Sequence, residues 1–198
     1  MCVAPEFPAS NAKEFIEALR RNPGKYTYGN DGVGGTMQLG AERIFKALGV
    51  KARAVPFGGA GETARKFLGG HVDIYGGSLP PILPHVAAGK AKCLLVTSAE
   101  DNPSVPQASG LRALGIPELE TSLWWGVIGP RGLPQNLIAT LEAAFRKAAE
   151  SPKIKEALAK IGAEPVVRGP QEFATLIDNE STAFGQVAKD LGLERRAQ

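Results

Sequence analysis

Glycine gathers at three points in this sequence, each where a short apolar stretch gives way to a helical pattern. The three segments cover residues 29–35, 58–61 and 76–77. Glycine adopts backbone conformations that other residues avoid, so segments of this kind are typical of tight turns between strands and helices. Strands that alternate with helices favour a mostly parallel sheet with helices on both faces. The sequence therefore predicts an α/β fold.

The periodicity of the apolar residues places helices and strands around these turns. A first helix is expected to have Ser10 as its N-cap and to end before Pro23 and Gly24, which cannot continue it. A second helix over 37–48 has its apolar residues on one face and Gly49 as its stop. The other elements predicted in this half are a helix over 62–68 and strands at 26–28, 50–55, 72–75 and 92–96.

The last third of the chain predicts mainly helices. Residues 102–120 are rich in Pro, Ser and Gly and are predicted to be a surface connection between two lobes. A strand is expected over 123–128 and a short one over 163–167. Proline is favoured in the first turn of a helix. Three helices are expected to begin near Pro134, Pro152 and Pro170.

Composition excludes several classes of protein. With 43% hydrophobic and 22% charged residues, the chain of 198 residues can bury a core and is not disordered. The net charge is only +3 and no basic face concentrates it, so nucleic acid is not an expected partner. No basic and apolar leader pattern follows Met1, so the chain as given carries no export signal. Cys2 and Cys93 are the two cysteines, and their pairing stays open.

Patterns typical of catalysis or metal binding are weak. His71 and Asp73 would lie on the same face of a strand, which could orient an imidazole, but no nucleophile motif accompanies them. The two histidines and two cysteines stand at four distant places without the spacing of metal ligands. We therefore expect no catalytic residue, no metal site and no cofactor.

The first glycine segment is the best candidate for a binding site. The helix after it begins with N–H groups that have no partner within the helix, and these groups together with the helix dipole favour a carboxylate or a phosphate. Gly35 or Thr36 at the cap would leave amides or a hydroxyl available to that anion. A dinucleotide-binding motif is excluded because Met37 stands where its third glycine is required. The alternative is a turn that only reverses the chain.

The other two glycine segments strengthen this hypothesis. In an open α/β sheet, ligands bind outside the carboxyl ends of the strands, and all three segments are expected to meet there. A small anion held by backbone amides is the simplest ligand for such a place.

An ordered series of motifs adds a family resemblance. The motifs are YGNDGVGGT at 28–36, VPFGG at 55–59, LGGHVD at 68–73, LP at 79–80 with PH at 84–85 and AGK at 88–90, VTSA at 96–99, and GAEP at 162–165. In this order they resemble the Bug or TctC family, the extracytoplasmic solute receptors of tripartite tricarboxylate transporters. The resemblance implies a two-lobed fold of the type II periplasmic binding proteins, a periplasmic location, membrane transporter components as partners, and no enzymatic activity.

The resemblance also divides the chain and assigns the site. Residues 1–7 would be the crossover strand between the lobes, 8–122 a complete second lobe, and 123–198 the C-terminal part of a partial first lobe. Typical members are longer before the position of Met1, so this chain resembles an N-terminally short relative. Family members frequently carry a polar side chain where Gly77 stands. The candidate ligand-binding residues are Asn30, Asp31, Gly32, Val33, Gly34, Gly35, Thr36, Gly58, Gly77 and Ser78.

Two hypotheses of function follow. The first is a solute-binding protein that recognises a small carboxylate, either a di- or tricarboxylate or an amino acid. The alternative is a truncated scaffold that acts through homodimerisation or another protein interaction without solute transport, because missing strands would leave apolar surface and a sheet edge to be covered.

Overall fold

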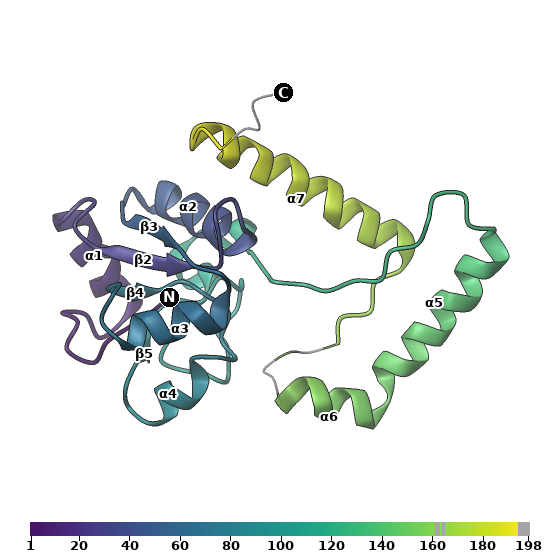
Figure 1. Cartoon of the computed structure of the whole chain (residues 1–198), viewed down its shortest axis with the longest axis horizontal. Coiled ribbons are helices and arrows are strands. Elements are labelled where there is room, and N and C mark those ends of the chain that lie inside the picture. The colour runs from purple at the N-terminus through teal and green to yellow at the C-terminus, as the bar shows by residue number, and fades with distance from the viewer. Residues whose placement is uncertain (161–162, 164, 194–198) are drawn as a thin grey trace. The chain divides into compact units, whose positions relative to one another are not determined.

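The computed structural model describes residues 1–160, 163 and 165–193. The chain, drawn in Figure 1, forms two compact units. Unit 1 comprises Met1–Leu123 with the segment that begins at Gln186, and unit 2 comprises Trp124–Gly185. None of the helices in the described part is both long and apolar enough to span a membrane.

Unit 1 is built on a five-stranded sheet in the order β3-β2-β4-β1-β5. The strands are β1 Cys2–Val3, β2 Thr27–Asn30, β3 Arg53–Pro56, β4 Ile74–Tyr75 and β5 Lys92–Cys93. β2 pairs in parallel with β3 and β4, as predicted, whereas β1 is antiparallel to both β4 and β5. The sheet is therefore mixed. The prediction of a mostly parallel sheet missed β1 because this strand precedes the first helix and belongs to no strand–helix–strand unit.

The helices predicted for unit 1 are confirmed. They are α1 Ala12–Arg21, α2 Thr36–Leu48 and α3 Ala60–Leu68, whereas the short helix α4 Leu83–Ala87 was not predicted. Gly49 ends α2 in the left-handed conformation, at φ 66°. The N-cap of α1 is Asn11 and not Ser10, because the Asn11 side chain accepts a hydrogen bond from the Glu14 N–H at 2.9 Å. The Ser10 N–H in turn donates to the Glu14 carboxylate at 2.7 Å, so Glu14 also holds the residue before the cap.

The segment predicted as a surface connection, 102–120, is partly a core element. It contains two short 3-10 helices, η1 Leu111–Leu114 and η2 Pro117–Leu119. Val105, Ala108 and Leu111 are each at most 1% exposed, so they pack into unit 1. Its many Pro, Ser and Gly residues produce tight turns rather than a linker, which composition alone does not distinguish.

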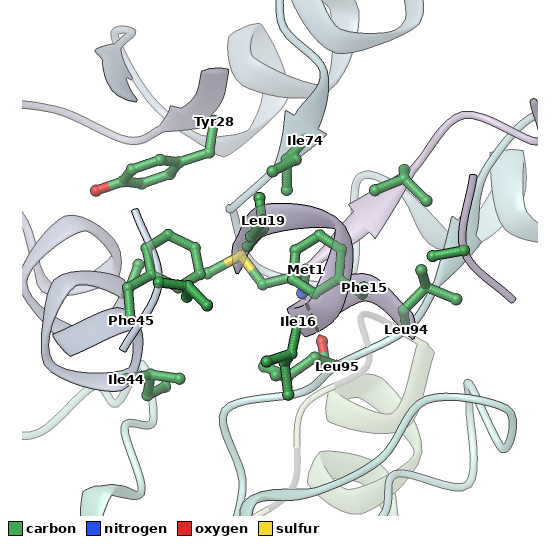
Figure 2. Packing of buried hydrophobic residues seen from close by; sticks show 14 of the residues in the cluster. Met1, Phe15, Ile16, Leu19, Tyr28, Ile44, Phe45, Ile74, Leu94 and Leu95 are labelled. Carbon is green, nitrogen blue, oxygen red and sulfur yellow. Dashed lines mark hydrogen bonds between the residues drawn. The ribbon is translucent and has the colours of Figure 1, made fainter. Parts of the chain in front are cut away.

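Two apolar clusters cover the two faces of the sheet. Ile74 of β4 faces one cluster with α1 and α2, while the next residue, Tyr75, faces the other with α3, as the alternation of side chains along a strand requires. Figure 1 shows α1 and α2 on one side of the strands and α3 and α4 on the other. Figure 2 shows the first cluster, in which Tyr28 and Phe45 approach edge to face with ring centroids 5.4 Å apart.

The two cysteines form a disulfide. Cys2 of β1 lies directly opposite Cys93 of β5, and their sulfur atoms are bonded. Both residues are at most 1% exposed. The disulfide therefore joins the first strand of the chain to the last strand of the sheet inside the second cluster.

Unit 2 is helical. Its helices are α5 Gln135–Glu150, α6 Pro152–Lys160 and α7 Pro170–Asp190. The end of α7, from Gln186 on, belongs to unit 1. Pro152 and Pro170 are first helical residues, as predicted, and Pro134 is an N-cap. Neither α5 nor α7 has a fully buried residue. None of the described residues of unit 2 is buried as the core residues of unit 1 are.

The predicted strand at 123–128 does not form. Trp125, Val127 and Ile128 are 75%, 65% and 77% exposed, and no strand in the described residues pairs with this segment. An extended segment becomes a strand only beside a partner. In the second predicted strand, 163–167, residue 164 lies outside the described residues, and 165–167 are not assigned to a strand.

Candidate functional site

The parallel strands β3, β2 and β4 bring the three glycine segments to one edge of the sheet. β3 and β4 flank β2, so their carboxyl ends are neighbours. The Phe57 N–H donates to the Asn30 carbonyl and the Gly76 N–H to the Gly29 carbonyl, both at 2.9 Å. The predicted convergence of the three loops is confirmed.

The first loop has a backbone that requires glycine. Gly32 and Gly34 have φ angles of 133° and 72°, which side-chain-bearing residues rarely adopt. Gly35 is the N-cap of α2 with no side-chain hydrogen bond, and Thr36 is the first helical residue. The loop thus delivers the start of a 13-residue helix to the edge of the sheet.

Several amides of this loop are satisfied internally. The Gly32 N–H donates to Asn30 Oδ1 at 3.1 Å, and the Gly34 N–H donates to Gln38 Oε1 at 2.7 Å. The Gly35 N–H donates to the Gly32 carbonyl at 3.2 Å. In contrast, no hydrogen-bond acceptor for the N–H groups of Val33 and Thr36 is found in the described part of the chain. These two groups are the free backbone donors of the loop.

Two buried polar atoms beside the loop have no hydrogen-bond partner among the described residues. They are Asn30 Nδ2, a donor, and Asp31 Oδ1, an acceptor. Asn30 is 0% exposed, and its other side-chain atom already bonds the Gly32 amide, so the carboxamide lies against the loop. A buried polar group left unpaired costs about 1–3 kcal/mol, so these two atoms are expected to meet a bound molecule or an ordered water.

The charge state of Asp31 is shifted by its surroundings. Burial raises the pKa of the Asp31 carboxyl, and the backbone N–H groups of Asp31 and Met37 lower it only in part. Burial and the nearby Asp31 charge also raise the pKa of Tyr75. Asp31 therefore has weaker compensation for a negative charge than an ordinary surface carboxylate.

At the second loop, an acidic side chain of the protein occupies the helix start. Glu62 Oε2, in the first turn of α3, accepts a hydrogen bond from the Gly58 N–H at 2.9 Å. Thr63 Oγ1 donates to the carbonyls of Asn30 and Gly59 at 3.1 and 3.0 Å. The Gly58 amide is thus already used within its own loop.

At the third loop, Tyr75 fills the space beside Gly77. The Tyr75 hydroxyl donates to the Ser78 carbonyl at 2.6 Å. A Cβ atom added to Gly77 would lie 2.6 Å from that hydroxyl oxygen. A side chain at position 77 therefore requires the Tyr75 ring to move.

The histidine and aspartate considered for catalysis do not form a pair. Asp73 Oδ2 accepts hydrogen bonds from the Thr27 N–H and hydroxyl at 2.7 and 2.8 Å, so this carboxylate holds β2 beside β4. His71 is exposed. Within the described residues, no three His, Cys, Asp or Glu side chains are grouped as metal ligands would be.

Comparison with known proteins identifies the family. Residues 1–193 match the family TctC, described as "Tripartite tricarboxylate transporter family receptor". The chain belongs to the TctC family. A curated relative, the "UPF0065 protein in gbd 5'region" of Cupriavidus necator, is 30% identical over 195 residues, which are 98% of this chain and 59% of the relative.

Solved structures show the same fold. A protein described as a periplasmic transporter is 31% identical with a TM-score of 0.81, and the alignment covers 95% of this chain and 63% of that protein. "R. palustris Rpa4515 with adipate" is 29% identical, also with a TM-score of 0.81, over 96% of this chain and 64% of that protein. The predicted α/β fold of a periplasmic binding protein with one partial lobe is confirmed. This TctC chain spans less than two thirds of the length of each of these three proteins.

Two residues that shape the site were not among the sequence candidates. Gln38 caps the Gly34 amide, and Tyr75 fills the space at Gly77. The four-residue spacing from Gly34 to Gln38 at a helix start is a signal that could have indicated the first. The role of Tyr75 depends on the direction in which its side chain points, which the sequence does not indicate.

Replacing Asp31 with asparagine is expected to stabilise this TctC chain by about 1 kcal/mol at neutral pH, because a neutral amide avoids the cost of a partly buried negative charge. The folded state raises the pKa of Asp31, so it holds the proton more tightly than the unfolded state does. The wild-type chain therefore loses stability as the pH rises from about 4, the ordinary pKa, through the raised value, and the variant does not.

Urea unfolding at neutral pH and below about pH 4 measures this difference. The extra stability of Asp31→Asn over the wild type should vanish at the lower pH. Glu118→Gln removes an exposed carboxylate of unit 1 and is the matched control. A variant that is less stable than the wild type at neutral pH would contradict the expectation.

Proposed function

We propose that this chain binds a small carboxylate solute at the start of α2, as the receptor of a tripartite transporter in the periplasm. The observation that carries the proposal is the set of free donors at that place. Val33 N–H, Thr36 N–H and the buried Asn30 Nδ2 have no acceptor among the residues that the structure describes. A carboxylate has two oxygens that accept hydrogen bonds from such donors.

The helix dipole favours α2 over α3 for this role. The first turn of α2 contains no acidic residue, whereas the first turn of α3 contains Glu62, which already occupies the Gly58 amide. The N-terminus of a helix stabilises a negative charge through its dipole and its free amides. Asp31, which precedes α2, takes the Met37 N–H, but the Val33 and Thr36 amides stay available to an external carboxylate.

Family membership supports the same ligand class. Rpa4515, at 29% identity, has a structure with adipate, a linear dicarboxylate. The disulfide between Cys2 and Cys93 supports the periplasmic location, because such bonds persist in that compartment. The transporter's membrane components are the partners that we propose from the family. No catalytic step is part of the proposal.

The division into lobes belongs to the proposal as well. We assign 1–7 to the crossover strand, 8–122 to the second lobe and 123–198 to part of the first lobe. The compact unit Met1–Leu123 supports this boundary. In the longer relatives, the residues outside the matched region would contribute the rest of the first lobe.

Thr36→Asp tests the site. A carboxylate at the first helical position should repel the solute and weaken its binding at least about tenfold, which corresponds to 1.4 kcal/mol. The substitution should not impair folding, because an acidic residue is favourable in the first turn of a helix. Isothermal titration calorimetry with adipate, succinate and citrate measures the affinity.

Thr36→Asn is the matched control, because it has the same shape without the charge. It should retain most of the affinity. Equal binding by wild type and Thr36→Asp would remove this loop from the site, and no binding of any carboxylate by the wild-type chain would overturn the proposed function.

A second candidate function is association with another copy of the chain. The exposed apolar residues Trp125, Val127 and Ile128 favour it, because contiguous apolar surface is normally covered. Light scattering separates the two functions. A monomer that binds carboxylates supports the receptor alone, and a dimer that binds none supports the scaffold.

A further inference from the structure

We propose that Asp31 makes this receptor select solutes with an ammonium group beside the carboxylate, so that an amino acid binds more tightly than the dicarboxylate of the same carbon chain. The inference rests on the proposed function and names its substrate class. It assigns to Asp31 the role of accepting hydrogen bonds from the solute.

The first observation is an acceptor without a donor. Asp31 Oδ1 is buried and has no hydrogen-bond partner in the described part of the protein. It lies against the start of α2, because a Cβ atom on Gly35 would be 3.2 Å from it. The Tyr75 hydroxyl, whose proton goes to the Ser78 carbonyl at 2.6 Å, does not supply the missing donor.

The second observation is a charge without a counter-charge. The ion pairs within the described residues join Arg21 to Glu17, Lys46 to Asp190, Arg112 to Glu100 and Arg146 to Glu142, and none of them includes Asp31. Burial is the largest influence on the pKa of Asp31, and the groups that lower it are the neutral N–H groups of Asp31 and Met37 and no cation. A cation brought by the solute would compensate this carboxylate.

The third observation is a buried donor next to this acceptor. Asn30 is 0% exposed, and its carboxamide is aimed at the loop through the bond from the Gly32 amide to Oδ1, which leaves Nδ2 unpaired. Consecutive residues thus present one unpaired donor and one unpaired acceptor. The free N–H groups of Val33 and Thr36 belong to the same loop.

This arrangement matches the ionic form of an amino acid. In an amino acid the ammonium and carboxylate groups are attached to one carbon, so they reach an acceptor and donors that are also adjacent. The carboxylate would bind the donors at the start of α2, and the ammonium would donate to Asp31. A dicarboxylate would instead place a second negative charge near Asp31, where like charges repel.

The test compares two solute pairs that differ only in the amino group, L-glutamate with glutarate and L-aspartate with succinate. Calorimetry on the wild-type chain should show at least one amino acid bound tenfold or more tightly than its partner. In Asp31→Asn this preference should fall to threefold or less. The control Glu118→Gln, which removes an exposed carboxylate of η2, should keep the preference of the wild type.

A second measurement does not depend on a variant. In wild-type protein labelled for carbon NMR, L-glutamate should lower the pKa of the Asp31 carboxyl, whereas glutarate should raise it. This readout distinguishes contact with an ammonium group from an indirect effect of the substitution on folding.

The outcomes separate the inference from the proposed function. If glutarate, succinate or adipate binds as tightly as the amino acids, the receptor function stands and the inference is overturned. If Asp31→Asn keeps the preference, the ammonium binds elsewhere or Asp31 is satisfied by water only, and the inference is again overturned. If neither an amino acid nor a dicarboxylate binds, the inference and the proposed function are both overturned.

Discussion

Phe15→Ala is expected to lower the free energy of unfolding of unit 1 by about 3–5 kcal/mol, the range for deleting a buried aromatic ring. Phe15 is 0% exposed in the cluster between the sheet and the helices α1 and α2. Its ring lies 6.0 Å from that of Phe7, centroid to centroid. Truncation leaves a cavity that the surrounding strands can fill only in part.

The matched control is Phe145→Ala in α5. Phe145 is 48% exposed, so the same truncation there should cost less than about 1 kcal/mol. The unfolding of the two units can be followed separately, because both tryptophans, Trp124 and Trp125, belong to unit 2. Tryptophan fluorescence in urea follows unit 2, and hydrogen exchange of the β2 amides follows unit 1. A loss at Phe145 as large as that at Phe15 would show that another chain covers α5 in solution.

Replacing both Cys2 and Cys93 with alanine is expected to cost about 4 kcal/mol. The disulfide closes a loop over a sequence separation of 91 residues, and closing a long loop restricts the unfolded chain strongly. Changing both residues avoids an unpaired buried thiol. Urea unfolding of the double variant and the oxidised wild type measures the difference.

A reductant provides the control for this prediction. Both cysteines are at most 1% exposed, so dithiothreitol should reduce the bond in unfolding concentrations of urea but only slowly in the native protein. The reduced wild type should then match the double variant in stability. A difference below about 1 kcal/mol between oxidised and reduced protein would show that the unfolded chain gains little freedom when the bond is lost.

The elements that the sequence predicts well are those with local causes. The helix α2 follows from an apolar face over a dozen residues and from Gly49, both within one segment. The N-cap of α1 was misplaced by one residue, although Glu14 stands three positions after Asn11, the spacing of a capping box. The strand expected at 123–128 does not form, because a strand needs a pairing partner that is distant in the sequence.

The same division holds for the site. Glycine at 32 and 34 predicted the loop, because positive φ angles need glycine wherever they occur. The sequence alone did not decide whether Cys2 and Cys93 pair, because the bond depends on the insertion of β1 between β4 and β5. The unpaired state of Asp31 also depends on the packing around it and on the Tyr75 hydroxyl, which bonds elsewhere.

The place of β1 in the sheet also sets an order of folding. The first strand of the chain lies between β4 and β5, so its hydrogen-bonding partners are made some seventy to ninety residues later. Contacts so distant in sequence form slowly, because the intervening chain must first be ordered. We expect β2, β3 and β4 to assemble with their helices first and β1 to enter last. As the chain emerges from a ribosome or an export channel, β1 must therefore stay unpaired until β4 and β5 have followed it.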